Sequence, residues 1–176
     1  ERSLSVPQAQ TEAIRCVLGP QDDYFSPDMV EQFFATDWVI SATSDRMGYR
    51  LEGPPLTHAR SPNIVSDGIA YGSLQIPGNG QPLLLLADRG TTGGYPKIAT
   101  VMTADLGRAA QTPVGSVVRF RPVPIAEAQE ATRQFNQRIR SLHTQCRWVG
   151  QEGISSDVLF AGHGAGHAVN ALDPQA

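Results

Sequence analysis

Apolar and polar residues alternate over short stretches that glycine and proline separate, a pattern that predicts β-strands joined by turns. Residues 83–87 are apolar at every position, which indicates a strand buried on both faces, inside a barrel or beneath a second layer. The sequence Pro-Gly-Asn-Gly at 77–80 predicts a tight turn, because Asn-Gly tolerates the positive φ that such turns need. The predicted strands are 11–18, 38–42, 47–51, 74–76, 83–87, 98–103 and 115–122.

Three helices interrupt this β pattern. Ser-Pro-Asp at 26–28 predicts a helix start, since serine caps, proline suits the first turn and aspartate suits the positive end of the helix dipole. Thr103 is the candidate cap of a second short helix, and residues 124–142 form one long helix with an incomplete apolar stripe. We therefore expect a mainly β domain at 1–123, a C-terminal helix at 124–143 and a loosely attached glycine-rich tail at 144–176.

Composition excludes several classes of protein. The 176 residues carry a net charge of −3, which argues against a nucleic-acid binder, and contain no apolar run long enough to span a membrane. The two cysteines, Cys16 and Cys146, form no CxxC motif and no disulfide framework, so we expect a reducing compartment and a cytoplasmic protein. The chain opens on Glu1 with neither Met nor a signal-like segment, and we expect it to be a piece of a larger protein.

The strongest candidate for chemistry is the loop that follows the apolar strand 83–87. Glycines let a ligand approach the backbone, and hydroxyl and carboxylate groups can orient a small amide. The alternative is a tight turn that needs glycine at positive φ, with Asp88 as a local cap. The polar and glycine residues of this loop are Asp88, Thr91, Thr92, Gly93, Gly94 and Tyr95.

A second candidate cluster lies at residues 44–53, where Arg46 or Arg50 could hold a carboxylate or phosphate through two hydrogen bonds. The alternative is a solvated hairpin with weak cross-strand ion pairs. Lys97 is the single lysine beside thirteen arginines; it belongs to no phosphate-binding loop, and codon preference is an alternative to function. We expect no metal site, because glycines around His163 and His167 disfavour the helix that their spacing would need.

Three strings, in this order along the chain, resemble one family. They are Ser-Asp-Arg-Met-Gly-x-Arg-Leu-Glu-Gly at 44–53, Gly-Ser-Leu-Gln-Ile-Pro-x-x-Gly-Gln-Pro at 72–82 and Leu-Ala-Asp-Arg-x-Thr-Thr-Gly-Gly-Tyr-Pro at 86–96. The resemblance covers roughly residues 14–122. It is to the biotin-dependent carboxyltransferase family, which includes allophanate hydrolase subunit 2, Kip-type proteins and the C subunit of 5-oxoprolinase.

The resemblance implies a cyclophilin-like β-barrel, the second of two such halves in full-length members, with two short helices and one longer C-terminal helix. It also implies a site built from the matching positions. From the chemistry of these side chains, we expect the loop at 91–94 to bind an amide or carboxylate and Asp88 to orient it. Gln75 and Gln81 would hydrogen-bond a lactam or ureido group. The candidate catalytic residues are Asp88, Thr91, Thr92 and Tyr95, and the candidate substrate-binding residues are Gln75, Gln81, Gly93, Gly94, Arg46 and Arg50.

Three functions remain open on the resemblance. The first is part of a multi-subunit hydrolase that uses ATP to open 5-oxoproline to glutamate. Its partners would be a smaller Kip-type protein, similar to the B subunit of 5-oxoprolinase, and a LamB/YcsF-like protein. The second is carboxyl transfer from carboxybiotin to urea or another small amide. The third is a non-catalytic partner of the smaller Kip-type protein that modulates a kinase.

The chain also departs from the family's pattern. The N-terminal half, with its Thr-Val-Gln-Asp and Ser-Gly-Ala-Met-Asp strings, is missing, and neither a biotin-attachment Met-Lys-Met nor an ATP motif is visible. Because carboxyltransferase sites are shared between domains, we expect the fragment alone to be inactive. The residues after about 143 match nothing in the family.

Overall fold

The computed structural model describes residues 12–145, with side chains described as far as Leu142. The chain divides into two compact units, residues 1–137 and 138–176. The first unit holds the β domain and the first part of the long helix, and the described part of the second unit is the end of that helix. The predicted tail beyond residue 145, with Cys146, His163 and His167, lies outside the described residues.

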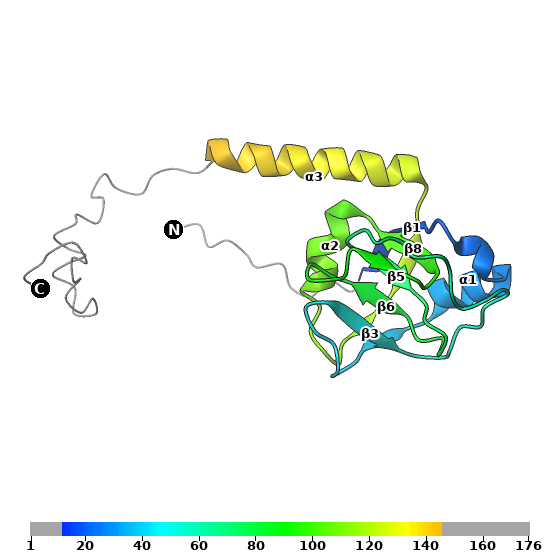
Figure 1. Ribbon diagram of the computed structural model, residues 1–176. Coiled ribbons are helices and arrows are strands. Elements are labelled where there is room, and N and C mark those ends of the chain that lie inside the picture. Colours follow the sequence, from blue (N-terminus) through cyan, green and yellow to red (C-terminus); the bar gives the residue numbers. More distant parts are fainter. Residues whose placement is uncertain (1–11, 146–176) are drawn as a thin grey trace, which may run out of the picture. The chain divides into compact units, whose positions relative to one another are not determined.

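Eight strands form one continuous sheet in the order β10-β1-β8-β5-β6-β3-β2-β9 (Figure 1). The edge strands β9 and β10 are consecutive in the chain and only Arg119 separates them, so the sheet curls until its two edges meet as a nearly closed barrel. The mainly β prediction is confirmed. The eight strands are β1 (Ile14–Leu18), β2 (Trp38–Ile40), β3 (Gly48–Glu52), β5 (Ser73–Gln75), β6 (Leu83–Leu85), β8 (Lys97–Val101), β9 (Val117–Val118) and β10 (Phe120–Pro122).

The three predicted helices are present as α1 (Pro27–Ala35), α2 (Thr103–Ala110) and α3 (Ile125–Gln145), together with a short 3₁₀ turn, η1 (Asp22–Tyr24). Ser26 caps α1 as predicted, because its hydroxyl accepts a hydrogen bond from the Met29 amide at 3.4 Å. The prediction that Thr103 caps α2 is wrong. Met102 occupies the cap position with extended backbone and no side-chain hydrogen bond, and Thr103 is the first helical residue.

The barrel core is aliphatic around β5, β6 and β8 and aromatic beneath α1. Phe33 of α1 is fully buried and stacks on Phe120 of β10, with ring centroids 5.3 Å apart. Trp38 closes the same cluster and donates its indole N–H to the Phe33 carbonyl at 2.9 Å. These contacts bury the apolar face of α1 against the seam where β10 nears the opposite edge of the sheet.

Two predicted segments differ from the structure. The stretch 115–122 is two short strands rather than one, because Arg119 stands at the corner where the chain passes from one sheet edge to the other. The glycine-rich loop is partly a strand: β7 (Thr92–Gly93) pairs with β4 (Asp67–Gly68) in a separate two-stranded ribbon. Among the residues that the structure describes, none of the helices has the length and apolarity that a membrane crossing requires.

Candidate functional site

Four side chains stand in one row across the outer face of the sheet. Pairing places Arg50 of β3 opposite Leu83 of β6, Leu83 opposite Gln75 of β5, and Gln75 opposite Lys97 of β8. Side chains of paired residues project from the same face in a regular sheet, so Arg50, Leu83 and Gln75 point away from the core that their neighbours fill. The β5–β8 register shifts between Leu74 and Gln75, so the row passes a bulge before it reaches Lys97. Two cations therefore stand at the ends of the row, with an apolar side chain and an amide between them.

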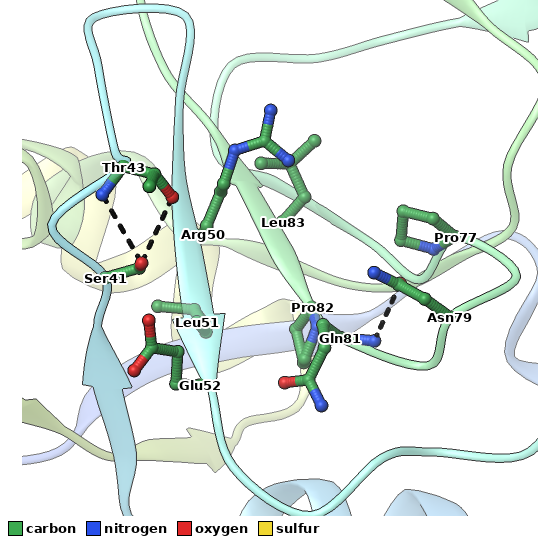
Figure 2. Close-up of a pocket in the computed structure, with 10 residues that line it drawn as sticks. All are labelled: Ser41, Thr43, Arg50, Leu51, Glu52, Pro77, Asn79, Gln81, Pro82 and Leu83. Atoms are coloured by element: carbon green, nitrogen blue, oxygen red, sulfur yellow. Dashed lines mark hydrogen bonds between the residues drawn. The ribbon is translucent and has the colours of Figure 1, made fainter.

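The Arg50 end of the row opens into a cavity of about 210 Å³ (Figure 2). Figure 2 shows Arg50 and Glu52 of β3 between the Ser41–Thr43 hairpin on one side and the turn that carries Gln81 on the other. The structure thus brings together two of the predicted substrate-binding residues, Arg50 and Gln81. The cavity is lined by Ser41, Thr43, Arg50, Leu51, Glu52, Pro77, Asn79, Gln81, Pro82 and Leu83.

Arg50 and Gln81 present complementary groups to this cavity. The Arg50 guanidinium is exposed and makes no hydrogen bond or ion pair with another described residue. The Gln81 amide donates to the Gly53 carbonyl at 3.0 Å, while its buried Oε1 has no hydrogen-bond partner among the described residues. The exposed guanidinium can bind a negative group, whereas Gln81 Oε1 is a buried acceptor that a ligand's N–H could satisfy only once the side chain shifts toward the cavity.

The Lys97 end of the row is covered by the β4–β7 ribbon. Gln75 is buried and donates its amide to the Tyr95 carbonyl at 3.3 Å. Gly93 lies directly over this amide: a Cβ there would stand 2.9 Å from Gln75 Nε2 and 2.6 Å from Ile69 Cδ1. Gln75, Gly93 and Tyr95 therefore lie together, and side chains of the protein itself make the close approach to the Gly93 backbone.

Lys97 is a residue that the sequence interpretation left without a role. Its side chain is only 3% exposed, and its ammonium donates to Asp67 Oδ2 at 2.8 Å and to the Gly68 carbonyl at 3.2 Å. The Lys97 ammonium, followed by the Gly68 amide, lowers the pKa of the Asp67 carboxyl below its usual range. The signal available in the sequence was that the single lysine directly follows the Gly-Gly-Tyr-Pro string.

Asp88 and Arg46 lie away from the cavity. Asp88 Oδ2 and Arg46 Nε form an exposed ion pair at 3.2 Å just beyond the end of the β3–β6 pairing at which Gly48 faces Leu85. Glu52 and Gln81 lie at the opposite end of that pairing, and β3 spans roughly 13 Å from Gly48 to Glu52 at about 3.3 Å per residue. Arg46 is therefore absent from the cavity that Arg50 lines, although the sequence places both in one candidate cluster, and it pairs with Asp88 instead.

The remaining predicted loop residues are near the ribbon surface. Thr91 and Thr92 are exposed, Gly94 is half-buried and Tyr95 presents 41% of its surface to solvent. The alternative of a turn that needs glycine at positive φ is wrong for Gly93 and Gly94, because the positive-φ residues of the described chain are Gly72, Gly80 and Gly115. Among the side chains of residues 12–142, no group of three could hold a metal ion.

Comparisons with known proteins place the chain in a family. Residues 1–122 match the carboxyltransferase domain, subdomain A and B. The chain is 41% identical to the C subunit of 5-oxoprolinase from Haemophilus influenzae over 65% of its length and 38% of that protein. It is 38% identical to the C subunit of 5-oxoprolinase from Escherichia coli over 75% of its length and 44% of that protein. The chain thus spans less than half the length of these relatives.

A second group of relatives is named for urea. The chain is 28% identical to the urea amidolyase of Saccharomyces cerevisiae over 73% of its length and 8% of that protein. Among solved structures, the urea carboxylase of Kluyveromyces lactis superposes with a TM-score of 0.69 at 26% identity, over 75% of this chain and 13% of that one. The relatives of this chain are therefore named for two different substrates.

Proposed function

Because the chain belongs to the carboxyltransferase domain family, subdomains A and B, we propose that it is part of a multi-subunit amide-processing hydrolase, an ATP-dependent 5-oxoprolinase. The observation that carries the proposal is the identity of 41% and 38% to two proteins named as the C subunit of 5-oxoprolinase. The substrate would be 5-oxoproline and the product glutamate. The partners would be a smaller Kip-type protein and a LamB/YcsF-like protein, in the cytoplasm.

The cavity at the Arg50 end of the row suits this substrate. 5-Oxoproline carries one carboxylate and one lactam N–H. The unpartnered Arg50 guanidinium would bind the carboxylate through two charge-assisted hydrogen bonds, and Gln81 Oε1 would accept the lactam N–H. The site would thereby position the lactam carbonyl for the step in which the ring opens.

ATP would be held outside the described part of this chain. Neither α1 nor α2 begins after a glycine-rich loop of the kind that cradles phosphates, since extended Ser26 and Met102 immediately precede them. ATP supplies the free energy for opening a stable lactam. We assign its binding to a partner protein and give this chain the task of holding the amide.

The test is steady-state kinetics of the complex assembled with its partner proteins. Arg50→Ala should raise KM for 5-oxoproline about tenfold or more, because a charged hydrogen-bond partner is lost, and Arg50→Lys should recover part of the loss. Arg60→Ala is the matched control, since Arg60 is an exposed arginine that pairs with Asp23 away from the cavity. Unchanged KM and kcat for Arg50→Ala would show that the cavity takes no part in the reaction.

A second candidate function is carboxyl transfer from carboxybiotin to urea, which the similarity to the urea carboxylase structure favours. The Arg50 guanidinium would then face the carboxylate of carboxybiotin and Gln81 Oε1 an N–H of urea. The two functions separate in one assay of the complex with ATP. Glutamate formed from 5-oxoproline supports the first, and biotin-dependent carboxylation of urea supports the second. Binding of the smaller Kip-type protein with neither activity would point to a non-catalytic partner.

A further inference from the structure

Three polar side chains are buried side by side on the outer face of β5 and β8. Ser73 is 1% exposed, Gln75 is 3% exposed and Lys97 is 3% exposed. Ser73 and Gln75 are two residues apart on β5 and so share a face, and Gln75 is paired with Lys97. Such groups are buried at a cost unless hydrogen-bond partners or counter-charges compensate them. Their cover at the Lys97 end of the row is the β4–β7 ribbon.

Ser73 lacks that compensation. Its hydroxyl is buried and has no hydrogen-bond partner among the described residues. Its neighbour across the sheet on β8 is Thr100. A buried hydroxyl without a partner is uncommon in native proteins and points to a ligand or water that completes its bonding.

The ion pair between Lys97 and Asp67 is asymmetric. The Lys97 side chain is 3% exposed, whereas the Asp67 side chain is 52% exposed. Asp67 also accepts a hydrogen bond from Gln21 Nε2 at 3.3 Å, and the Gln21 Oε1 accepts from the Lys97 amide at 3.2 Å. The Asp67 carboxylate is therefore open to solvent on one side, whereas the Lys97 ammonium that it contacts is buried against the sheet.

The ribbon that carries Asp67 is short. Its strands have two residues each, and two further backbone hydrogen bonds, Ile69 N to Thr91 O at 2.9 Å and Ile64 N to Gly94 O at 2.8 Å, continue the pairing. An isolated two-stranded ribbon is marginally stable. Lifting it would uncover the Lys97 ammonium and the Gln75 amide while the barrel core remains packed.

We propose that Lys97, Gln75 and Ser73 form a binding site for a small carboxylate beneath the β4–β7 ribbon, and that Asp67 occupies the carboxylate position when no ligand is bound. An ammonium, an amide N–H and a hydroxyl supply hydrogen-bond donors and one positive charge, which match a carboxylate. A neutral amide in the same place would leave the ammonium without a counter-charge. The site goes beyond the proposed function, because it recognises a carboxylate whichever amide the complex processes.

The test uses the single lysine of the chain as a reporter. In the chain labelled with ¹⁵N-lysine, Lys97 supplies one backbone amide signal and one side-chain ammonium signal. Titration with sodium acetate at constant ionic strength should move both signals to saturation, and acetamide should not. Asp67→Asn removes the internal carboxylate and should tighten acetate binding about fivefold, the scale of a partly exposed ion pair.

Asp23→Asn is the matched control, because Asp23 is 54% exposed and pairs with Arg60 outside this site. An acetate Kd that is the same in Asp67→Asn, Asp23→Asn and the parent chain would overturn the proposal, as would equal shifts with acetamide. Lys97→Met, followed through the Gly68 and Gly93 amides, should lose acetate binding, and Lys97→Arg should keep most of it. If acetate binds and 5-oxoproline does not, the result counts against the proposed substrate and leaves this site standing.

Discussion

Asp105 at the start of α2 is bound by Arg15 of β1 through three hydrogen bonds. Asp105 Oδ1 accepts from Arg15 Nη2 at 2.7 Å, and Oδ2 accepts from Arg15 Nε at 3.0 Å and from the Arg15 backbone amide at 2.9 Å. Arg108, one turn further along α2, adds a fourth hydrogen bond at 2.9 Å. The carboxylate is almost fully buried, so it fixes α2 against the edge of the barrel.

Loss of this carboxylate should destabilise the fold. Asp105→Asn leaves two arginines facing a neutral amide, and we expect the free energy of unfolding at pH 7 to fall by about 3 kcal/mol, as for a buried pair with one partner removed. Urea denaturation followed by circular dichroism measures the change. Glu130→Gln is the control, since Glu130 forms an exposed pair with Arg133 on α3, and it should change stability by under about 1 kcal/mol.

The same carboxylate should make the fold sensitive to acid. Burial alone would raise the pKa of Asp105, but the hydrogen bonds from Arg15 and the charge of Arg108 lower it below the usual range. A lowered folded-state pKa contributes stability that is present above the unfolded-state pKa and lost as pH falls through the folded-state value. The unfolding free energy should therefore fall below about pH 4. Asp105→Asn should flatten this part of the profile, and parallel profiles would contradict the assignment.

The aromatic contacts under α1 predict a large cost for Phe33→Ala. Phe33 is fully buried between Phe34, Trp38 and Phe120, so its removal leaves a cavity beside the barrel seam. We expect a loss of about 3–5 kcal/mol in unfolding free energy. Phe135→Ala is the control, because Phe135 is 39% exposed on α3, and should cost under about 1 kcal/mol. Equal losses would mean that the aromatic cluster contributes no packing energy of its own.

Much of the fold follows from local pattern. The capping hydroxyl of Ser26 and the positive φ of Gly80 in the Asn-Gly turn are short-range features that the sequence predicts. The predicted burial of residues 83–87 holds for Leu84, Leu85 and Leu86, whereas Leu83 is half-buried and Ala87 is exposed. The sequence predicts Thr103 as the cap of α2 because threonine is a good capping residue. The extended backbone of Met102 instead places the cap one residue earlier.

The site was harder to predict because it depends on long-range register. The row from Arg50 to Lys97 exists only because β8, β5, β6 and β3 are neighbours in that alignment, which no local pattern reveals. Arg46 precedes the start of β3 at Gly48 and pairs with Asp88, so it lies outside the cavity that Arg50 lines although the two residues are close in sequence. The strands of the β4–β7 ribbon have two residues each, which is too short for an alternating pattern of apolar and polar residues. The sequence therefore does not predict the pairing of Asp67 with Gly93.

Cys16 should resist thiol reagents while the protein is folded. It lies fully buried on β1, and burial followed by the nearby charge of Asp105 raises the pKa of its thiol. Because the thiolate is the reactive form, we expect Cys16 to react with an aromatic disulfide reagent at least about a hundredfold more slowly in the native chain than in urea. A Cys146→Ser background isolates the signal of Cys16. Equal rates in both conditions would contradict the burial of this strand.

The turn at the cavity offers a paired test of backbone strain. Gly80 has φ +76°, and a Cβ there would lie 2.6 Å from the Leu56 carbonyl oxygen and 2.9 Å from the Leu56 amide nitrogen. Gly78, two residues earlier, has no such conformation, and its Cβ would meet only Pro62 carbons at 3.7 Å. Gly80→Ala should therefore cost about 2 kcal/mol or more, whereas Gly78→Ala should be neutral or slightly stabilising. Because Gln81 follows Gly80 directly, Gly80→Ala should also raise KM in the assembled complex, and Gly78→Ala should not. Equal unfolding midpoints for the two variants would show that the turn relaxes without strain.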